Sequence, residues 1–200
     1  MTGPVKDTYQ SEVLVEQIDQ LDRASWWDPS NPSVRLTRSL ADYQRQLGPI
    51  LRCANSLHFI DPHLDPTEAH YEEFRDLLVC AGKRRPAPLI EIHRVCYKGS
   101  GSNRTILKVN ELEQDFRREL GGALQSAEIQ ADVFIWDHFH DRYLISNLVG
   151  ILLPNGFDTS HNPKDITTWT RLGRRERDDI QREFEEASGQ HKLHGRFSIP

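Results

Sequence analysis

Two spacings of apolar residues alternate along this chain from residue 39 onward. Apolar side chains three or four residues apart predict a helix with one buried face, and short apolar runs between polar residues predict strands. We therefore expect helices starting at Ser39 and at residues 67–81, 110–124 and 173–188. We expect strands at residues 57–60, 89–95, 131–136, 143–146 and 149–153.

The order of these elements predicts an α/β domain over residues 39–200. Strands alternate with helices as far as residue 136, which is typical of strands joined by helical crossovers. The strands at 143–146 and 149–153 follow each other too closely for such a crossover, so part of the sheet must be antiparallel. The predicted architecture is a mixed β-sheet flanked by helices.

Residues 1–38 differ from this pattern and are predicted to be a helical and irregular N-terminal extension. Residues 11–23 have apolar positions at roughly helical spacing, whereas residues 24–38 contain prolines and are unsuited to regular structure. That second stretch holds the neighbouring Trp26 and Trp27. The two indoles either pack on the domain or form an exposed patch that docks a partner protein.

Composition excludes several classes of protein. With 25 Lys and Arg against 30 Asp and Glu, the net charge is −5, which argues against a protein that coats DNA by charge alone. No run of 18 apolar residues is present, so a membrane span is not expected, and residues 1–10 do not resemble a secretory signal. Three widely spaced cysteines are too few for a disulfide framework, and we predict a cytoplasmic location.

The charge is unevenly distributed along the chain. Residues 82–109 hold seven Lys and Arg against one Glu, a local net charge of +6. This segment is either a solvated basic surface or a site for a phosphate-bearing ligand. The second interpretation rests on the glycine- and serine-rich loop from Lys98 to Arg104, which can offer backbone N–H groups and cations to one anion. The loop lacks the Gly-Lys-Ser/Thr ending of a P-loop.

The densest candidate chemistry lies between residues 136 and 147. In an extended backbone alternate side chains share a face, so His138, His140 and Arg142 should point the same way. Imidazole can act as a nucleophile or a general acid or base, and guanidinium neutralises phosphate charge. One histidine could instead hydrogen-bond a neighbouring carbonyl. The pair His138 and His140 lacks a third ligand, so no metal site is predicted.

Four further residues are candidates for a supporting role. Asp61 follows a predicted strand, at the end where α/β sheets place ligands, and His63 lies two residues on. Asp61 could alternatively cap the following turn. Glu91 and His93 share one face of their strand and either face the pocket or form a pair within the core.

These residues carry a resemblance to a known superfamily. His140-x-Arg142, then Asn147, then the turn at Asn155-Gly156, resembles a variant of the phospholipase D signature HxKxxxxD followed by a Gly/Ser/Asn turn. Residues 59–63 resemble the first-strand element of many members. The order of elements over residues 39–188 is similar to single-motif bacterial members. It is also similar to the phospholipase-D-like C-terminal domain of microtubule-interacting-and-trafficking proteins.

The resemblance implies a role for each matching position. His140 would be the nucleophile that forms a phosphohistidine, and Arg142 would bind the phosphate in place of the motif lysine. Asn147 takes the place of the motif aspartate, so the carboxylate is lost there. The turn at Asn155 and Gly156 would contact phosphate. The resemblance implies no metal and no organic cofactor.

The family's chemistry also needs a second histidine, and this chain carries one motif. A homodimer could place His140 of each subunit across a two-fold axis, or His138 or His63 could serve within one subunit. A third alternative is a degenerate site that binds phosphate without cleaving it.

Together these features predict a phospholipase D-like domain that binds a phosphodiester or phosphorylated ligand, with nucleic acid preferred. The domain would be degenerate or weakly active as a phosphodiesterase or nuclease through His140, in a bacterial defence or DNA-processing system. Lys98 and Arg104 would help to attract the anion. The alternative is a non-catalytic adaptor that docks a partner protein or anionic lipid head groups.

Overall fold

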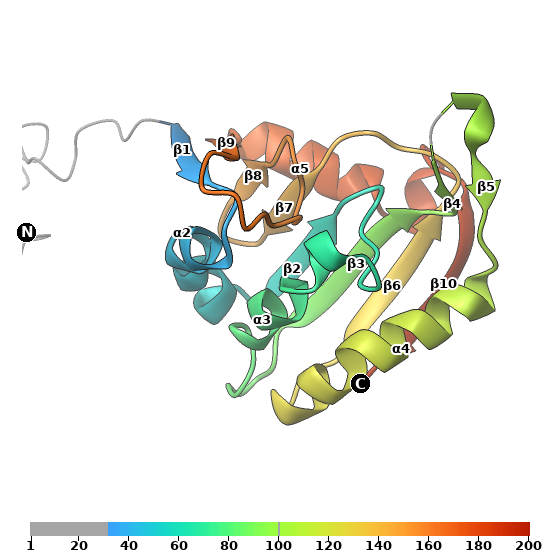
Figure 1. Cartoon of the computed structure of the whole chain (residues 1–200), viewed down its shortest axis with the longest axis horizontal. Helices are drawn as coiled ribbons and strands as arrows, with labels where there is room; N and C mark the ends of the chain where they lie inside the picture. The colour runs from blue at the N-terminus through green and yellow to red at the C-terminus, as the bar shows by residue number, and fades with distance from the viewer. Residues whose placement is uncertain (1–31, 100) are drawn as a thin grey trace, which may run out of the picture. The chain divides into compact units, whose positions relative to one another are not determined.

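An eight-stranded mixed sheet organises the part of the chain that the computed structural model describes, residues 32–99 and 101–200 (Figure 1). Its strand order is β1-β9-β8-β7-β2-β3-β6-β10, and β4 and β5 form a separate hairpin. The strands are β1 (Ser33–Thr37), β2 (Ser56–Ile60), β3 (Leu89–Val95), β4 (Tyr97–Lys98), β5 (Thr105–Ile106), β6 (Ala131–Trp136), β7 (Tyr143–Ser146), β8 (Gly150–Leu152), β9 (Ile166–Arg171) and β10 (Leu193–Ile199).

The central strands β2, β3 and β6 are parallel, and the remaining pairs in the sheet are antiparallel. Helices lie on the sheet's faces, so the predicted mixed sheet flanked by helices is confirmed. The helices are α2 (Leu40–Cys53), α3 (Phe74–Val79), α4 (Val109–Ser126) and α5 (Arg174–Glu183), with short 3-10 turns at Ala69–Tyr71, Gly101–Asn103 and Glu186–Ser188.

The helices are divided between the two faces of the sheet (Figure 1). Successive residues of a strand point to opposite faces, so Phe59 of β2 points away from His58. The ring of Phe59 packs on Phe74 of α3, with centroids 5.3 Å apart, on the face covered by α2, α3 and α4. On the other face Phe184, at the end of α5, packs 5.2 Å from the ring of His93.

The helix that begins after Ser39 forms as predicted, and the serine side chain caps it by accepting a hydrogen bond from the N–H of Asp42. The single helix predicted over residues 67–81 is wrong. This segment divides into the 3-10 turn and α3, because Tyr71 turns its hydroxyl toward the buried carboxylate of Asp61. Its predicted apolar face, with Tyr71 and Phe74, is nevertheless buried.

Five strands of the structure were not predicted from the sequence. In β9 only two of six residues are apolar, and Trp169 alone of these two is buried. Strand β10 contains Gly195 and alternates exposed and buried positions at the edge of the sheet. The hairpin strands β4 and β5 have two residues each. Sequence patterns of apolar and polar residues that are this short or this polar do not distinguish a strand from a loop.

Ser33–Thr37, which the sequence analysis placed in the irregular extension, pairs with β9 as strand β1. The prediction of irregular structure is wrong there, because ladder hydrogen bonds to β9 impose the extended backbone. The predicted helix at residues 11–23 and the pair Trp26 and Trp27 lie outside the described residues, so the division at residue 38 stays a prediction. Among the described helices, none is both long and apolar enough to cross a bilayer.

Candidate functional site

Polar side chains gather where the central parallel strands end. Asp61 follows β2, Tyr97 opens β4 directly after β3, and His138 stands two residues beyond β6. Since parallel strands end at one edge of a sheet, these residues meet there. Strand β7 runs antiparallel to β2 and pairs Tyr143 with Ile60, so Arg142, just before β7, lies at the same edge.

The structure brings His138 and His140 together in the connection between β6 and β7. Their rings lie edge to face with centroids 4.3 Å apart, and both residues are exposed. Phe139 between them is buried and packs against Phe184 at 5.0 Å. The buried phenyl ring therefore directs the two imidazoles outward, although this stretch is an unpaired loop and not a strand.

Tyr97 connects this pair of imidazoles to a cation. Its hydroxyl lies 2.9 Å from Nδ1 of His138, and the guanidinium of Arg104 stands over its ring, 4.3 Å from the centroid. Partial burial, followed by the charges of His140 and Arg104, lowers the pKa of His138. Tyr97 was not among the predicted site residues, although its position just after a predicted strand could have identified it.

Arg142 turns toward the buried carboxylate of Asp61, with Nε 3.5 Å from Oδ1. The side chain of Arg142 stays 27% exposed, so part of its guanidinium can meet a ligand. Burial raises the pKa of the Asp61 carboxyl, and hydrogen bonds and the Arg142 charge oppose that rise. Asp61 also accepts hydrogen bonds from the N–H groups of His63 and Phe157.

The predicted turn at Asn155 and Gly156 lies against Asp61. Gly156 has a φ of +70°, a left-handed conformation that glycine adopts readily. A Cβ at this position would lie 1.9 Å from Oδ2 of Asp61. Glycine is therefore required by the close approach of the turn to the buried carboxylate, and Asn155 beside it is half-buried.

His63 also stands at this edge, exposed, with its ring 6.5 Å from that of Tyr97. Partial burial of the ring is the main cause of its lowered pKa, and the charges of Arg142 and His140 act in the same direction. An imidazole that stays neutral near pH 7 can accept a proton from a ligand or from water.

Three predicted site residues lie elsewhere. Asn147 follows β7 at the opposite edge of the sheet, where its Oδ1 accepts hydrogen bonds from the N–H groups of Asn55 and Ser56. Four strand residues separate it from Arg142, so the structure does not bring it to His140. Glu91 and His93 point to the α5 face, away from the Asp61 carboxylate, and pair with each other and with His58.

The basic segment 82–109 does not form one surface. Arg84 and Arg85 precede β3, at the opposite edge from Tyr97, where Arg84 donates to the carbonyl of Ala54 and Arg85 pairs with Glu128. Lys98 pairs with Asp65 at 2.7 Å and with Glu68 at 3.2 Å. Of the two predicted phosphate-binding cations, Arg104 stands beside His138 and Lys98 is held by carboxylates.

Beside the imidazoles the surface is hollowed by a depression of about 450 Å³. His138 and His140 line it together with residues at the end of α5 and before β10, among them Glu183 and His191. Of the acidic side chains that line it, Asp137 accepts hydrogen bonds from the backbone N–H groups of His138 and Lys192. Both imidazoles therefore border the same depression.

No family model and no curated protein matches the sequence. Solved structures with a similar fold include the following two. Nuc from Salmonella typhimurium, a phospholipase D family member, has 9% sequence identity and a TM-score of 0.50, over 81% of this chain and 97% of Nuc. TrmBL2, described as an archaeal chromatin protein with a novel mode of DNA binding, has 12% identity and a TM-score of 0.43, over 94% of this chain. This chain spans 62% of the length of TrmBL2.

The similarity to Nuc is one of fold, at an identity too low to transfer function. It agrees with the mixed sheet, and it agrees with the superfamily that the motif around His140 resembles. The described part of this chain has a phospholipase D-like fold.

Proposed function

We propose that this domain binds a phosphodiester of a nucleic acid at the carboxyl edge of its sheet. The observation that supports this function best is the grouping of two exposed imidazoles, His138 and His140, with the guanidinium of Arg104. Phosphate oxygens accept hydrogen bonds from imidazolium and guanidinium, and an exposed Arg can also stack on a base.

We place binding ahead of cleavage. The motif resemblance implies that His140 takes the position of the family's nucleophile, but within residues 32–99 and 101–200 no carboxylate hydrogen-bonds to its ring or to that of His138. A carboxylate partner would orient an imidazole and raise its basicity. Any hydrolysis through His140 should therefore be weak, unless a second subunit of a homodimer supplies the missing groups.

Salt-dependent binding tests the site directly. We expect a fluorescent single-stranded oligonucleotide to bind, with a slope of log affinity against log salt that falls by about 1 in Arg104→Gln. Arg45→Gln on α2 removes the same charge from an exposed residue far from the site and should leave the slope unchanged. Equal slopes for both variants and the wild type would contradict the proposal.

The chemistry at His140 needs a separate measurement. We expect slow release of nitrophenol from bis-(p-nitrophenyl) phosphate, abolished in His140→Ala, while oligonucleotide affinity falls only a few-fold. Sedimentation at the same protein concentrations would show whether activity follows dimer formation. Turnover that persists undiminished in His140→Ala would rule out this residue as the nucleophile.

A further inference from the structure

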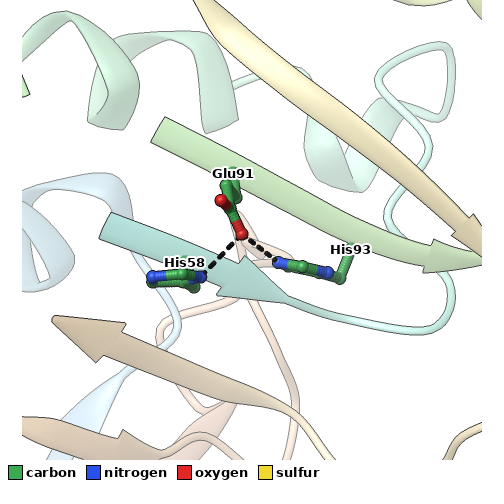
Figure 2. A group of neighbouring side chains, drawn as sticks. All are labelled: His58, Glu91 and His93. Atoms are coloured by element: carbon green, nitrogen blue, oxygen red, sulfur yellow. Dashed lines mark ion pairs between the residues drawn. The ribbon is translucent and has the colours of Figure 1, made fainter. Parts of the chain in front are cut away.

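A second cluster of ionisable side chains lies on the α5 face of the sheet. His58 on β2 is the register partner of Glu91 on β3, and His93 follows two residues later on the same face. Figure 2 shows both imidazoles directed toward the carboxylate of Glu91. Nδ1 of His58 lies 2.9 Å and Nε2 of His93 lies 3.2 Å from the same oxygen, Oε2.

Ion pairing alone leaves part of this cluster unexplained. His93 is fully buried, and its Nδ1 accepts a hydrogen bond from Nε1 of Trp136 at 3.0 Å. The neutral ring must therefore carry its proton on Nε2. That buried nitrogen makes no aligned hydrogen bond, despite its distance from Glu91. A buried N–H without an acceptor costs about 1–3 kcal/mol, so the metal-free arrangement of this ring is not fully satisfied.

The donor set is of a kind that binds transition metals. Two imidazole nitrogens and one carboxylate oxygen, His58, Glu91 and His93, lie within 4.8 Å of one another. Zinc takes such ligands at about 2.0–2.2 Å, so neighbouring donors around it lie roughly 3 to 3.5 Å apart. The two contacts to Glu91, 2.9 and 3.2 Å, are close to this range.

We propose that His58, Glu91 and His93 bind a divalent transition-metal ion of the Zn²⁺ class. Nδ1 of His58, a carboxylate oxygen of Glu91 and Nε2 of His93 are the three protein ligands. This site lies on the α5 face and is independent of the proposed phosphate site, to which none of the three residues contributes.

Solvent can reach the proposed site from one side. The Glu91 side chain is 31% exposed and lines a depression of about 560 Å³, together with Asp132 and residues around the start of β3. His58 is less exposed, at 13%, and His93 is buried. The ion would therefore enter past Glu91 and keep a coordination position open toward the depression, as three-ligand zinc sites do.

The hydrogen bond from Trp136 to His93 competes with metal binding, and this competition can be tested. Ligation at Nε2 of His93 moves the ring proton to Nδ1, where it meets the indole N–H. The Trp136 hydrogen bond is lost on binding, which weakens the affinity. Removing the indole N–H, which would be left buried without an acceptor, should therefore tighten binding by roughly five- to a hundredfold.

Titration with Zn²⁺ and Co²⁺ tests the site in the full chain. To remove the exposed imidazole pair as a competitor, the background is His138→Gln/His140→Gln. We expect one Zn²⁺ per chain, a rise in Tm on Zn²⁺ addition, and a visible absorption band with Co²⁺. Glu91→Gln and the half-buried His58→Gln should each lose roughly tenfold or more in affinity, while Trp136→Phe gains affinity.

A matched control comes from the other His–Glu contact near α5. Nε2 of His191 lies 2.7 Å from Oε1 of Glu183, and His191→Gln removes that pair without touching the proposed ligands. Zn²⁺ affinity unchanged in His191→Gln supports the site. Three results would overturn the proposal: no stoichiometric Zn²⁺ binding, Glu91→Gln and His58→Gln variants that bind Zn²⁺ as tightly as the parent protein, or a loss of Zn²⁺ affinity in His191→Gln. If circular dichroism shows that Glu91→Gln does not fold, the Zn²⁺ affinities of the His58→Gln and Trp136→Phe variants test the proposal.

Discussion

At the scale of single residues, Asp61 determines the geometry of the candidate site. Its buried carboxylate accepts hydrogen bonds from the N–H groups of His63 and Phe157 and from the Tyr71 hydroxyl, and it faces the guanidinium of Arg142. One side chain thus holds the end of β2, the 3-10 turn and the turn at Gly156. A buried carboxylate with this many donors fixes the direction of each group that donates to it.

Gly156→Ala should unfold more easily than the wild type. A methyl group would overlap Oδ2 of Asp61, and the positive φ adds strain, so we expect a loss of about 2 kcal/mol or more in the free energy of unfolding. Urea denaturation measures this. Gly122→Ala, on α4 with open space around it, is the control and should gain about 0.5–1 kcal/mol. Equal stability of the two variants would show that the turn can move away from Asp61.

At the scale of elements, the connection from β2 to α3 is attached to the β4–β5 hairpin through Asp65. This carboxylate accepts hydrogen bonds from Thr67 and pairs with Lys98 of β4 and with the buried Arg94 of β3. Burial raises the pKa of Asp65, but the Lys98 and Thr67 hydrogen bonds outweigh it, so the net shift is downward. Lys98 therefore holds the hairpin in place and is not free for a ligand.

Stability should fall in acid because of this contact. A carboxyl whose folded pKa is lowered stabilises the fold above its unfolded pKa, about 3.9, and loses that effect as the pH falls through the folded value. We expect the unfolding free energy of Asp65→Asn to depend less on pH between about 4 and 2 than that of the wild type. A double-mutant cycle with Lys98→Gln measures the coupling. Identical acid profiles would refute the role given to Asp65.

At the scale of the whole described molecule, aromatic packing connects the sheet to the site. Phe59 of β2 touches Phe74 of α3 and Phe157, which follows the glycine turn, with centroids 5.3 and 5.2 Å away. The three rings thereby place the turn at Gly156 against the sheet. A displacement of these three rings should therefore shift both the Asp61 carboxylate and the edge of the sheet where His140 lies.

Phe59→Ala should therefore lower stability and disturb the site together. Removing a fully buried phenyl ring costs about 3–5 kcal/mol of unfolding free energy. We also expect weaker oligonucleotide binding at temperatures where the variant is still folded. Leu148→Ala, at a side chain that is 53% exposed, is the control and should change stability by less than about 0.5 kcal/mol. If folded Phe59→Ala binds the oligonucleotide as tightly as the wild type, the packing of these rings does not influence the site.

Much of the fold could be predicted from the sequence because the apolar positions of its central elements are buried and recur at strand or helix spacing. Strands β2, β3 and β6 and helices α2 and α4 lie where their periodicity predicts them. The outer strands β1, β9 and β10 carry few apolar side chains, and pairing with neighbours, not local preference, makes them strands.

The sequence by itself determined which chemistry the chain carries: the imidazoles of His138 and His140, the guanidinium of Arg142 and the glycine turn. Only the tertiary structure decided which groups act together. The antiparallel direction of β7 removed Asn147 from the site, and ion pairs neutralised most of the +6 segment. The parallel register of β2 and β3 brought His58 to Glu91 and His93, because hydrogen-bonded strands align residues that are distant in sequence.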